Sequence, residues 1–83
     1  MPKIKIYSTT TCQFCRLEKA YLTSKGIAYE DIMVDMDPEK AKEMIELSGQ
    51  MGVPFTVIET DDGKTESILG FNKPKIDAVL GIA

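Results

Sequence analysis

The sequence predicts a small α/β domain in which strands and helices follow one another in the order β-α-β-α-β-β-α. Three observations support this prediction. Residues 3–8 alternate between polar and apolar side chains, as a strand does, and apolar residues at helical spacing follow them. Asp37-Pro38 is typical of a helix start, because Asp is a good N-cap and Pro fits the first helical position. Asp62-Gly63 is typical of a hairpin turn.

The first half of the chain is expected to form a strand–helix–strand unit. The strand at residues 3–8 is followed by a polar loop at 9–11 and a helix over about 14–25, which Gly26 ends in a left-handed conformation. A second strand is expected over about 27–35. A short unit of this kind usually makes a right-handed crossover between parallel strands. The predicted inward stripe of the helix consists of Phe14, Leu17, Ala20 and Tyr21, with Leu22 beside them.

The second half contributes two helices and a hairpin. A helix begins at Pro38 and is stopped by Gly49, and a loop at 50–54 leads into a strand at 55–58. The turn at 60–64 connects the strand at 55–58 to a partner strand at 64–69. Residues 70–72 end this partner strand, and a last helix covers about 73–80. The predicted inward residues are Ala41, Met44, Ile45 and Ser48 in the first of these helices and Ile76, Val79 and Leu80 in the last.

Composition limits the class of protein. The 83 residues are enough for one domain, which we expect to span residues 1–83. A net charge of −3 argues against nucleic acid or an anionic membrane as the main partner. No apolar run approaches the length of a membrane-spanning helix and no signal-peptide pattern begins the chain, so we expect a cytoplasmic protein. The chain has no histidine, which excludes Cys–His and Ser–His catalysis and histidine metal sites.

The two cysteines of the chain, Cys12 and Cys15, are spaced as C-x-x-C and lie where the first strand ends and the first helix begins. A helix N-terminus carries unpaired N–H groups and about half a positive charge, so a thiolate there is stabilised. Cys12, at the N-cap or in the first turn, is expected to feel most of this field. Cys15 follows on the same helix face, so the two sulfurs can meet as a disulfide. This arrangement predicts a redox-active pair.

The cysteine pair has two alternative roles that stay open. It could be buried and inert, or it could be half of a metal site. Zinc and iron–sulfur centres usually need about four ligands, and one chain supplies only the cysteine pair, so the second alternative requires a metal or cluster shared by a dimer. In a reducing cytoplasm a lone pair is more often catalytic or metal-binding than a permanent disulfide. We therefore expect thiol–disulfide chemistry in a monomer with no bound cofactor or metal.

Three segments of the chain resemble the glutaredoxin-like small redoxins of the thioredoxin-fold superfamily. Residues 7–15 hold the C-x-x-C pair, 48–54 hold a Val-Pro at the start of the third strand, and 70–71 are Gly-Phe. The resemblance covers nearly the whole chain. It implies a thioredoxin-like fold, with a four-stranded mixed sheet flanked by three helices, and the activity of a dithiol–disulfide oxidoreductase. The residues expected to hold the substrate are Gln13, Phe14, Val53, Pro54, Gly70, Phe71 and Asn72.

The proline at position 54 has two possible conformations. A trans bond is the ordinary expectation, since only about 5–6% of X–Pro bonds in folded proteins are cis. The resemblance implies the opposite, because the proline that faces the cysteines in these redoxins is cis. A cis bond between Val53 and Pro54 is expected to leave the N–H and C=O of Val53 free to pair with a substrate backbone.

The motifs also depart from the usual glutaredoxin pattern. Gln13 and Phe14 stand where glutaredoxins usually carry Pro-Tyr, and Thr9 matches a position where many have lysine. Residues 70–73 lack the Gly-Gly and following acidic residues that contact glutathione in many members. Their Gly-Phe is similar to that of the redoxins that serve ribonucleotide reductase and are recycled by thioredoxin reductase. The implied reductant is therefore glutathione or a thioredoxin-reductase-type donor, and electron donation to ribonucleotide reductase is a further expectation.

The cysteine pair and the resemblance together imply thiol–disulfide exchange in two steps. The Cys12 thiolate attacks the disulfide of a protein or small molecule and forms a mixed disulfide. Cys15 then attacks Cys12, which releases the reduced target and leaves the pair oxidised. An external donor restores the dithiol.

Overall fold

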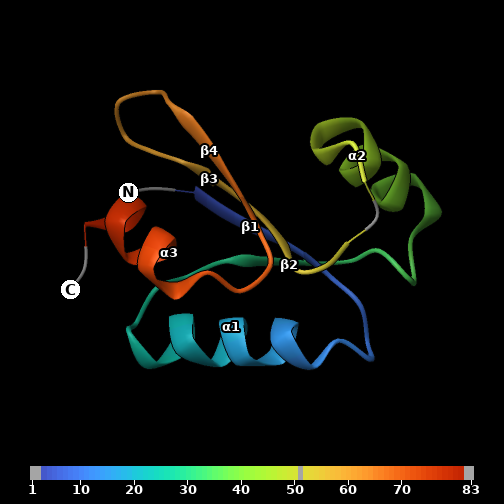
Figure 1. Cartoon of the computed structure of the whole chain (residues 1–83), viewed down its shortest axis with the longest axis horizontal. Coiled ribbons are helices and arrows are strands. Elements are labelled where there is room, and N and C mark those ends of the chain that lie inside the picture. Colours follow the sequence, from blue (N-terminus) through green and yellow to red (C-terminus); the bar gives the residue numbers. More distant parts are fainter. Residues whose placement is uncertain (1–2, 51, 82–83) are drawn as a thin grey trace.

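The computed structural model describes residues 3–50 and 52–81; Met51, within the loop expected at 50–54, lies outside the described residues. The observed elements confirm the predicted order β-α-β-α-β-β-α. Figure 1 shows a central sheet with helices on both sides. The elements are β1 (Lys3–Ser8), α1 (Gln13–Ser24), β2 (Glu30–Met33), α2 (Pro38–Ser48), β3 (Phe55–Glu59), β4 (Thr65–Leu69) and α3 (Lys73–Leu80).

The four strands form one mixed sheet in the order β2-β1-β3-β4, which confirms the predicted sheet. β1 runs parallel to β2, as expected for the crossover, and antiparallel to β3, and β3 is antiparallel to β4. Tyr7 of β1 pairs with Ile32 of β2 on one side and with Phe55 of β3 on the other. The end of β1 therefore lies beside the end of β2 and the start of β3.

β2 is shorter than the strand expected over 27–35. The N–H of Ile27 donates to the carbonyl of Leu22 at 3.0 Å, so this part of the chain closes the end of α1 instead of joining the sheet. At the other end the N–H of Val34 still donates to the carbonyl of Ser8 at 2.8 Å, just beyond the last paired residue. The strand is therefore limited to Glu30–Met33.

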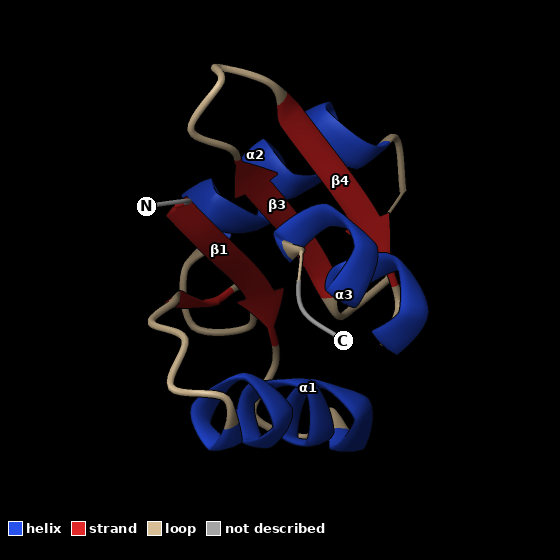
Figure 2. Cartoon of the chain, turned by 90° about the vertical axis from the view of Figure 1, so that its left-hand side faces the viewer, coloured by secondary structure: helices blue, strands red, loops and turns tan. Residues whose placement is uncertain are grey.

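Figures 1 and 2 show α1 and α3 on one side of the sheet and α2 on the other. Each face of the sheet carries its own hydrophobic cluster, one beneath α1 and α3 and one beneath α2. As predicted, α3 packs into its cluster through Ile76, with Val79 and Leu80 beside it. The cluster beneath α1 and α3 contains Ile4, Ile6, Leu22, Ile58, Ile68 and Ile76. The cluster beneath α2 contains Tyr7, Ile32, Val34, Met44 and Phe55.

The buried face of α1 is only in part the predicted one: Leu22 is buried and Tyr21 packs against the core, but the other residues differ. Phe14 and Leu17 are 63% and 48% exposed, and the buried residues of the helix are Cys15, Glu18 and Leu22. The buried face therefore includes Glu18. A prediction that selects only apolar residues as inward does not place a glutamate there. In α2 the inward position of Met44 is confirmed, whereas Ile45 is 37% exposed and the prediction for it was wrong.

α2 begins and ends as predicted. Oδ1 of Asp37 accepts hydrogen bonds from the N–H groups of Glu39 and Lys40 at 3.2 and 3.3 Å, and Pro38 occupies the first turn. At the other end Gly49 is the C-cap with φ 75°, a left-handed conformation that glycine adopts without steric cost.

Replacing Asp37 with Ala is expected to lower the free energy of unfolding by about 1 kcal/mol, because the N–H groups of Glu39 and Lys40 lose their hydrogen-bond acceptor. Urea unfolding followed by circular dichroism measures this difference. Glu46→Ala, which changes an exposed side chain of the same helix, is the matched control. If Asp37→Ala and Glu46→Ala were equally stable, the side chain of Asp37 would not be acting as a cap.

Candidate active site

The segments that hold the predicted site residues meet at one end of the sheet. The loop at 9–12 follows β1, residues 52–54 precede β3, and the turn at 70–72 follows β4. β3 is antiparallel to both of its neighbours, so its start lies beside the ends of β1 and β4. The N–H of Gly70 also donates to the carbonyl of Pro54 at 2.8 Å, which joins two of these segments directly. The structure therefore brings the three sequence motifs to the same end of the sheet.

Cys12 is the N-cap of α1. Its backbone is extended, with φ −80° and ψ 111°, and its Sγ accepts a hydrogen bond from the N–H of Cys15 at 3.1 Å. The sulfur thus takes the place that a Ser or Asp oxygen usually fills at an N-cap. The N–H groups and dipole of the helix favour negative charge on this atom. Because Cys12 is partly exposed, a substrate can approach it.

Cys15 lies one turn further along α1 and is completely buried. Burial is the main cause that raises the pKa of the Cys15 thiol to about 12, and the hydrogen bond with Cys12 acts in the same direction. A backbone hydrogen bond at Thr9 and the charge of Lys19 lower this pKa, but by less. Both cysteines are free. A partly exposed sulfur at a helix N-terminus and a buried thiol that keeps its proton suit an attacking and a resolving cysteine, respectively.

The loop that carries Cys12 is held from two sides through Thr10. The carboxylate of Asp35, in the connection after β2, accepts hydrogen bonds from the Thr10 N–H at 3.0 Å and from its hydroxyl at 2.6 Å. Arg16 of α1 donates from Nη2 to the Thr10 carbonyl at 2.9 Å. The hydrogen bonds from Thr10 lower the pKa of Asp35, so its carboxylate form persists at ordinary pH. The backbone leading to the attacking sulfur is thereby fixed.

The peptide bond between Val53 and Pro54 is cis, which confirms what the resemblance implies. Pro54 is buried and Val53 is partly buried. Among the described residues, no hydrogen bond uses the N–H or the C=O of Val53. These groups precede β3, whose start lies beside the end of β1. They are available to an extended chain bound next to the cysteines.

The other residues predicted for the site differ in exposure. Gln13 and Phe14 lie in the first turn of α1 and are both exposed. Phe71 is partly buried, because its ring packs against Tyr21 of α1 with 6.1 Å between the ring centroids. Asn72 is the N-cap of α3, where its Oδ1 accepts a hydrogen bond from an N–H of the first turn at 3.2 Å.

Three buried polar side chains, Ser8, Glu18 and Thr56, are absent from the sequence-based site. Ser8 donates to Oδ1 of Asp31 at 2.6 Å, and Thr56 donates to Oε2 of Glu18 at 2.6 Å. A signal for Glu18 exists in the sequence, because it follows Cys15 at the spacing of one helix face. A search for apolar stripes passes over it, since unpaired carboxyl groups are rarely buried.

Within residues 3–50 and 52–81, no group of three or more Cys, Asp or Glu side chains is placed to hold a metal ion. Cys15 is also fully buried, so it offers no surface to a cluster shared with a second chain. In the same part of the molecule, no helix is both long and apolar enough to cross a membrane.

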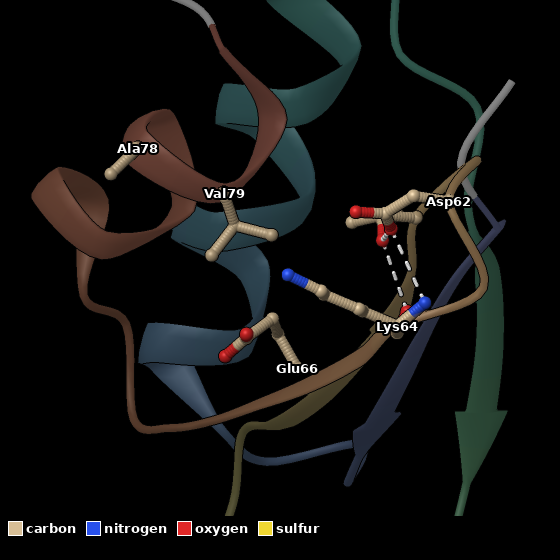
Figure 3. A pocket seen from close by; sticks show the side chains of 6 residues that line it. Asp62, Lys64, Glu66, Ala78 and Val79 are labelled. Atoms are coloured by element: carbon tan, nitrogen blue, oxygen red, sulfur yellow. Dashed lines mark hydrogen bonds between the residues drawn. The ribbon is translucent and has the colours of Figure 1, made fainter.

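An open groove lies at the opposite end of the sheet, between the β3–β4 hairpin and α3 (Figure 3). Asp62 accepts a hydrogen bond there from the N–H of Lys64 at 3.2 Å, which shapes the hairpin turn. The groove carries charges of both signs and contains none of the predicted site residues, so it is separate from the cysteine pair. It is lined by Thr60, Asp62, Lys64, Glu66, Ala78 and Val79.

Proteins of similar sequence include several glutaredoxins. Residues 4–62 match the glutaredoxin family model. An uncharacterized glutaredoxin-like 8.6 kDa protein in the rubredoxin operon of Clostridium pasteurianum is 47% identical over 77 residues, which cover 93% of this chain and 96% of that protein. Glutaredoxin 3 of Escherichia coli K12 is 37% identical over 59 residues, 71% of each chain.

Solved structures agree with this assignment. The glutaredoxin-like NrdH-redoxin of Escherichia coli superposes with a TM-score of 0.73 at 30% identity and covers 93% of both chains. Methanoredoxin of Methanosarcina acetivorans superposes with a TM-score of 0.82 at 26% identity, over 96% of this chain and 85% of that one. Together with the fold and the cysteine pair, these matches confirm the predicted thioredoxin-like architecture. The chain belongs to the glutaredoxin family and is a thiol–disulfide oxidoreductase.

Proposed function

We propose that the protein reduces disulfides through Cys12 and Cys15, with Cys12 as the attacking and Cys15 as the resolving cysteine. The observation that carries this proposal is the position of the Cys12 sulfur, which caps α1 and accepts the N–H of Cys15 at 3.1 Å. The helix N-terminus stabilises the thiolate that must attack. The buried thiol lies one turn away on the same helix, where the Cys12 sulfur is within its reach.

The exchange proceeds through a mixed disulfide between Cys12 and the target. The Cys12 thiolate forms a bond to one sulfur of the target disulfide, and the other sulfur leaves as a thiolate. Cys15 then loses its proton and attacks the Cys12 sulfur, so the mixed disulfide breaks and the target leaves fully reduced. The protein is left with a Cys12–Cys15 disulfide, which an external donor reduces with two electrons; one proton restores the Cys15 thiol, and the Cys12 sulfur returns to the thiolate.

The surroundings of the pair support binding of an extended segment of a disulfide-containing protein. The N–H and C=O of Val53, which form no hydrogen bond within the described part of the chain, are suited to pair with the backbone of this segment, as in the addition of a strand. The exposed first turn of α1 carries Cys15, and the turn after β4 lies beside Pro54, to which the N–H of Gly70 donates. In this proposal the binding residues are Gln13, Phe14, Val53, Pro54, Gly70, Phe71 and Asn72.

We propose that residues 1–83 act as a single domain, as a monomer in the cytoplasm and without a bound cofactor. The partners in this proposal are disulfide-containing proteins and the reductant, and not nucleic acid or membranes. The net charge of −3 supports the last point, because it disfavours polyanionic surfaces.

The reductant that we propose is a thioredoxin-reductase-type donor, with weak dependence on glutathione and with ribonucleotide reductase as a candidate acceptor of electrons. Glutathione is an anionic tripeptide, so cationic donors strengthen a site for it. Thr9 supplies no charge, and the ammonium of Lys73 lies over the Tyr21 ring, 5.2 Å from its centroid. The Escherichia coli NrdH-redoxin, a glutaredoxin-like protein described as having a thioredoxin-like activity profile, supports this proposal as a structural neighbour.

A coupled assay tests the choice of reductant. Reduction of a protein disulfide is measured with glutathione and its reductase, and separately with thioredoxin reductase, at equal protein concentration. We expect turnover at least about tenfold faster with thioredoxin reductase, a difference of about 1.4 kcal/mol in transition-state stabilisation. Saturable activity with glutathione and none with thioredoxin reductase would contradict the proposed donor. Inactivity with both donors and with a chemical dithiol would contradict the proposed function itself.

A further inference from the structure

Glu18 is a buried carboxyl that the two-step mechanism leaves without a role. Its side chain is 0% exposed, although it belongs to the helix that carries both cysteines. Oε2 accepts the hydroxyl of Thr56 at 2.6 Å, whereas Oε1 has no hydrogen-bond partner among the described residues. A buried oxygen left without a partner costs free energy, so the fold holds this carboxyl at a cost in stability.

Among residues 3–50 and 52–81, no cation forms an ion pair with this carboxyl. Lys19, the next residue, forms an ion pair with Asp31 at 3.0 Å, and Asp31 also accepts from Ser8. Burial raises the pKa of Glu18, and the Thr56 hydrogen bond lowers it by less. The charged groups near α1 have other partners or lie elsewhere: Asp77 accepts a hydrogen bond from Tyr21, Arg16 donates one to Thr10, Lys25 and Lys73 lie over the Tyr21 ring, and Glu66 lines the hairpin groove. The buried residues of the strands and of α3 on this side of the sheet are uncharged: Ile4, Ile6, Ser8, Thr56, Ile58, Ile68 and Ile76.

The carboxyl and the resolving cysteine share one face of α1. Residues at this spacing have Cβ atoms about 5–6 Å apart, and helical side chains lean toward the N-terminus of the helix. Glu18 therefore lies one turn from Cys15 on the buried face of the helix, and its long side chain can reach back toward that turn. Both residues are completely buried, so solvent has no direct access to the thiol proton that must leave during the second step.

We propose that Glu18 is the internal proton acceptor for Cys15, an inference that rests on the proposed roles of the two cysteines. As Cys15 attacks the mixed disulfide, its thiol proton passes to Oε1 of Glu18, directly or through one water. A Cys15–Cys12 bond forms, the bond from Cys12 to the target sulfur breaks, and the target leaves as a thiolate. When the pair is reduced again, the proton returns from the carboxyl to Cys15.

The pH dependence follows from this role. Only the carboxylate form of Glu18 accepts a proton, so the second step slows as the pH falls through the pKa of this group. Because burial raises the pKa of Glu18, the second step slows at a higher pH than it would if the proton acceptor were an exposed glutamate. At high pH the contribution of Glu18 shrinks, since hydroxide can remove the thiol proton.

The two steps can be followed separately by stopped-flow absorbance, with a symmetric aromatic disulfide as the substrate. Each half of this disulfide is coloured when it is released as a thiolate. The first thiolate reports the attack by Cys12, and the second reports the attack by Cys15. For Glu18→Gln we expect an unchanged first phase and a second phase slower by about 100-fold near neutral pH, a typical effect of removing a general base. The matched control, Glu46→Gln, removes an exposed carboxyl from α2 and is expected to change neither phase.

Thr56→Val provides a second variant that keeps the carboxyl. It removes the hydrogen bond that lowers the pKa of Glu18, so the inflection of the second phase is expected to move to higher pH. Titration of the Glu18 carboxyl by carbon-13 NMR, assigned through its bonds to the Glu18 backbone amide, is expected to show the same shift. This measurement does not depend on the folding of Glu18→Gln.

The outcomes separate this inference from the proposed function. A missing first phase in the wild type, or a second phase that never appears, would contradict the roles of the cysteines. Equal second phases in the wild type and Glu18→Gln at every pH would overturn the role of Glu18 alone. An inflection that does not move in Thr56→Val would also overturn it, because the acceptor would then be another group.

Discussion

Cys12→Ser is expected to abolish disulfide reduction, with a loss on the order of 10³-fold or more, as removal of an enzyme nucleophile typically causes. The hydroxyl that replaces the thiol can still cap α1 and accept the N–H of Cys15, so the helix start is preserved. It cannot form the mixed disulfide on which the reaction depends. The loss is therefore expected in the rate and not in the fold, and a coupled assay with circular dichroism of the same sample measures both.

The wild type treated with an alkylating agent provides a check on Cys12→Ser, because neither sample has a free thiol at position 12. Retention of activity in Cys12→Ser at even a tenth of the wild-type rate would assign the nucleophile to Cys15, the cysteine that remains.

Cys15→Ser is expected to convert the protein into a trap for its targets. Cys12 still attacks, but no second thiol resolves the mixed disulfide, so the adduct accumulates toward one target per protein chain. Removing the buried thiol leaves the capping contact in place, since it is the backbone N–H of residue 15 that donates to the Cys12 sulfur. Intact mass spectrometry of acid-quenched reactions measures the adduct.

The double variant lacking both thiols is the control for Cys15→Ser and is expected to give no adduct. If Cys15→Ser formed no adduct and turned over protein disulfides as fast as the wild type, the resolving role of Cys15 would be excluded.

Local signals in the sequence were sufficient for most of the fold. Asp37-Pro38 and Gly49 set the limits of α2 because capping depends on the residues at the helix end and little on the rest of the molecule. The C-x-x-C pair was placed correctly for the same reason, since the cap and the next turn belong to one continuous segment. The resemblance supplied the cis bond before Pro54, which no local pattern indicates.

The rest depended on contacts between distant segments. The orientation of α1 could not be read from apolar spacing, because Glu18 is stabilised in the interior by Thr56 of β3. Thr10 is likewise fixed by hydrogen bonds to Asp35, which follows another strand. In the sequence, Asp35 looks like an ordinary surface carboxylate. Hydrogen bonds of this kind become visible only when the strand order is known.

The difference in reactivity between the two cysteines is tested most directly by limited alkylation of the reduced wild-type protein. Iodoacetamide is added below one equivalent at mildly acidic pH, and the modified cysteine is identified by peptide mass spectrometry. We expect the label on Cys12, whose sulfur lies at the helix N-terminus and is partly exposed, and almost none on Cys15, whose buried thiol has a pKa of about 12. Labelling of Cys15 first, or of both cysteines equally, would contradict the assignment of the attacking and resolving roles.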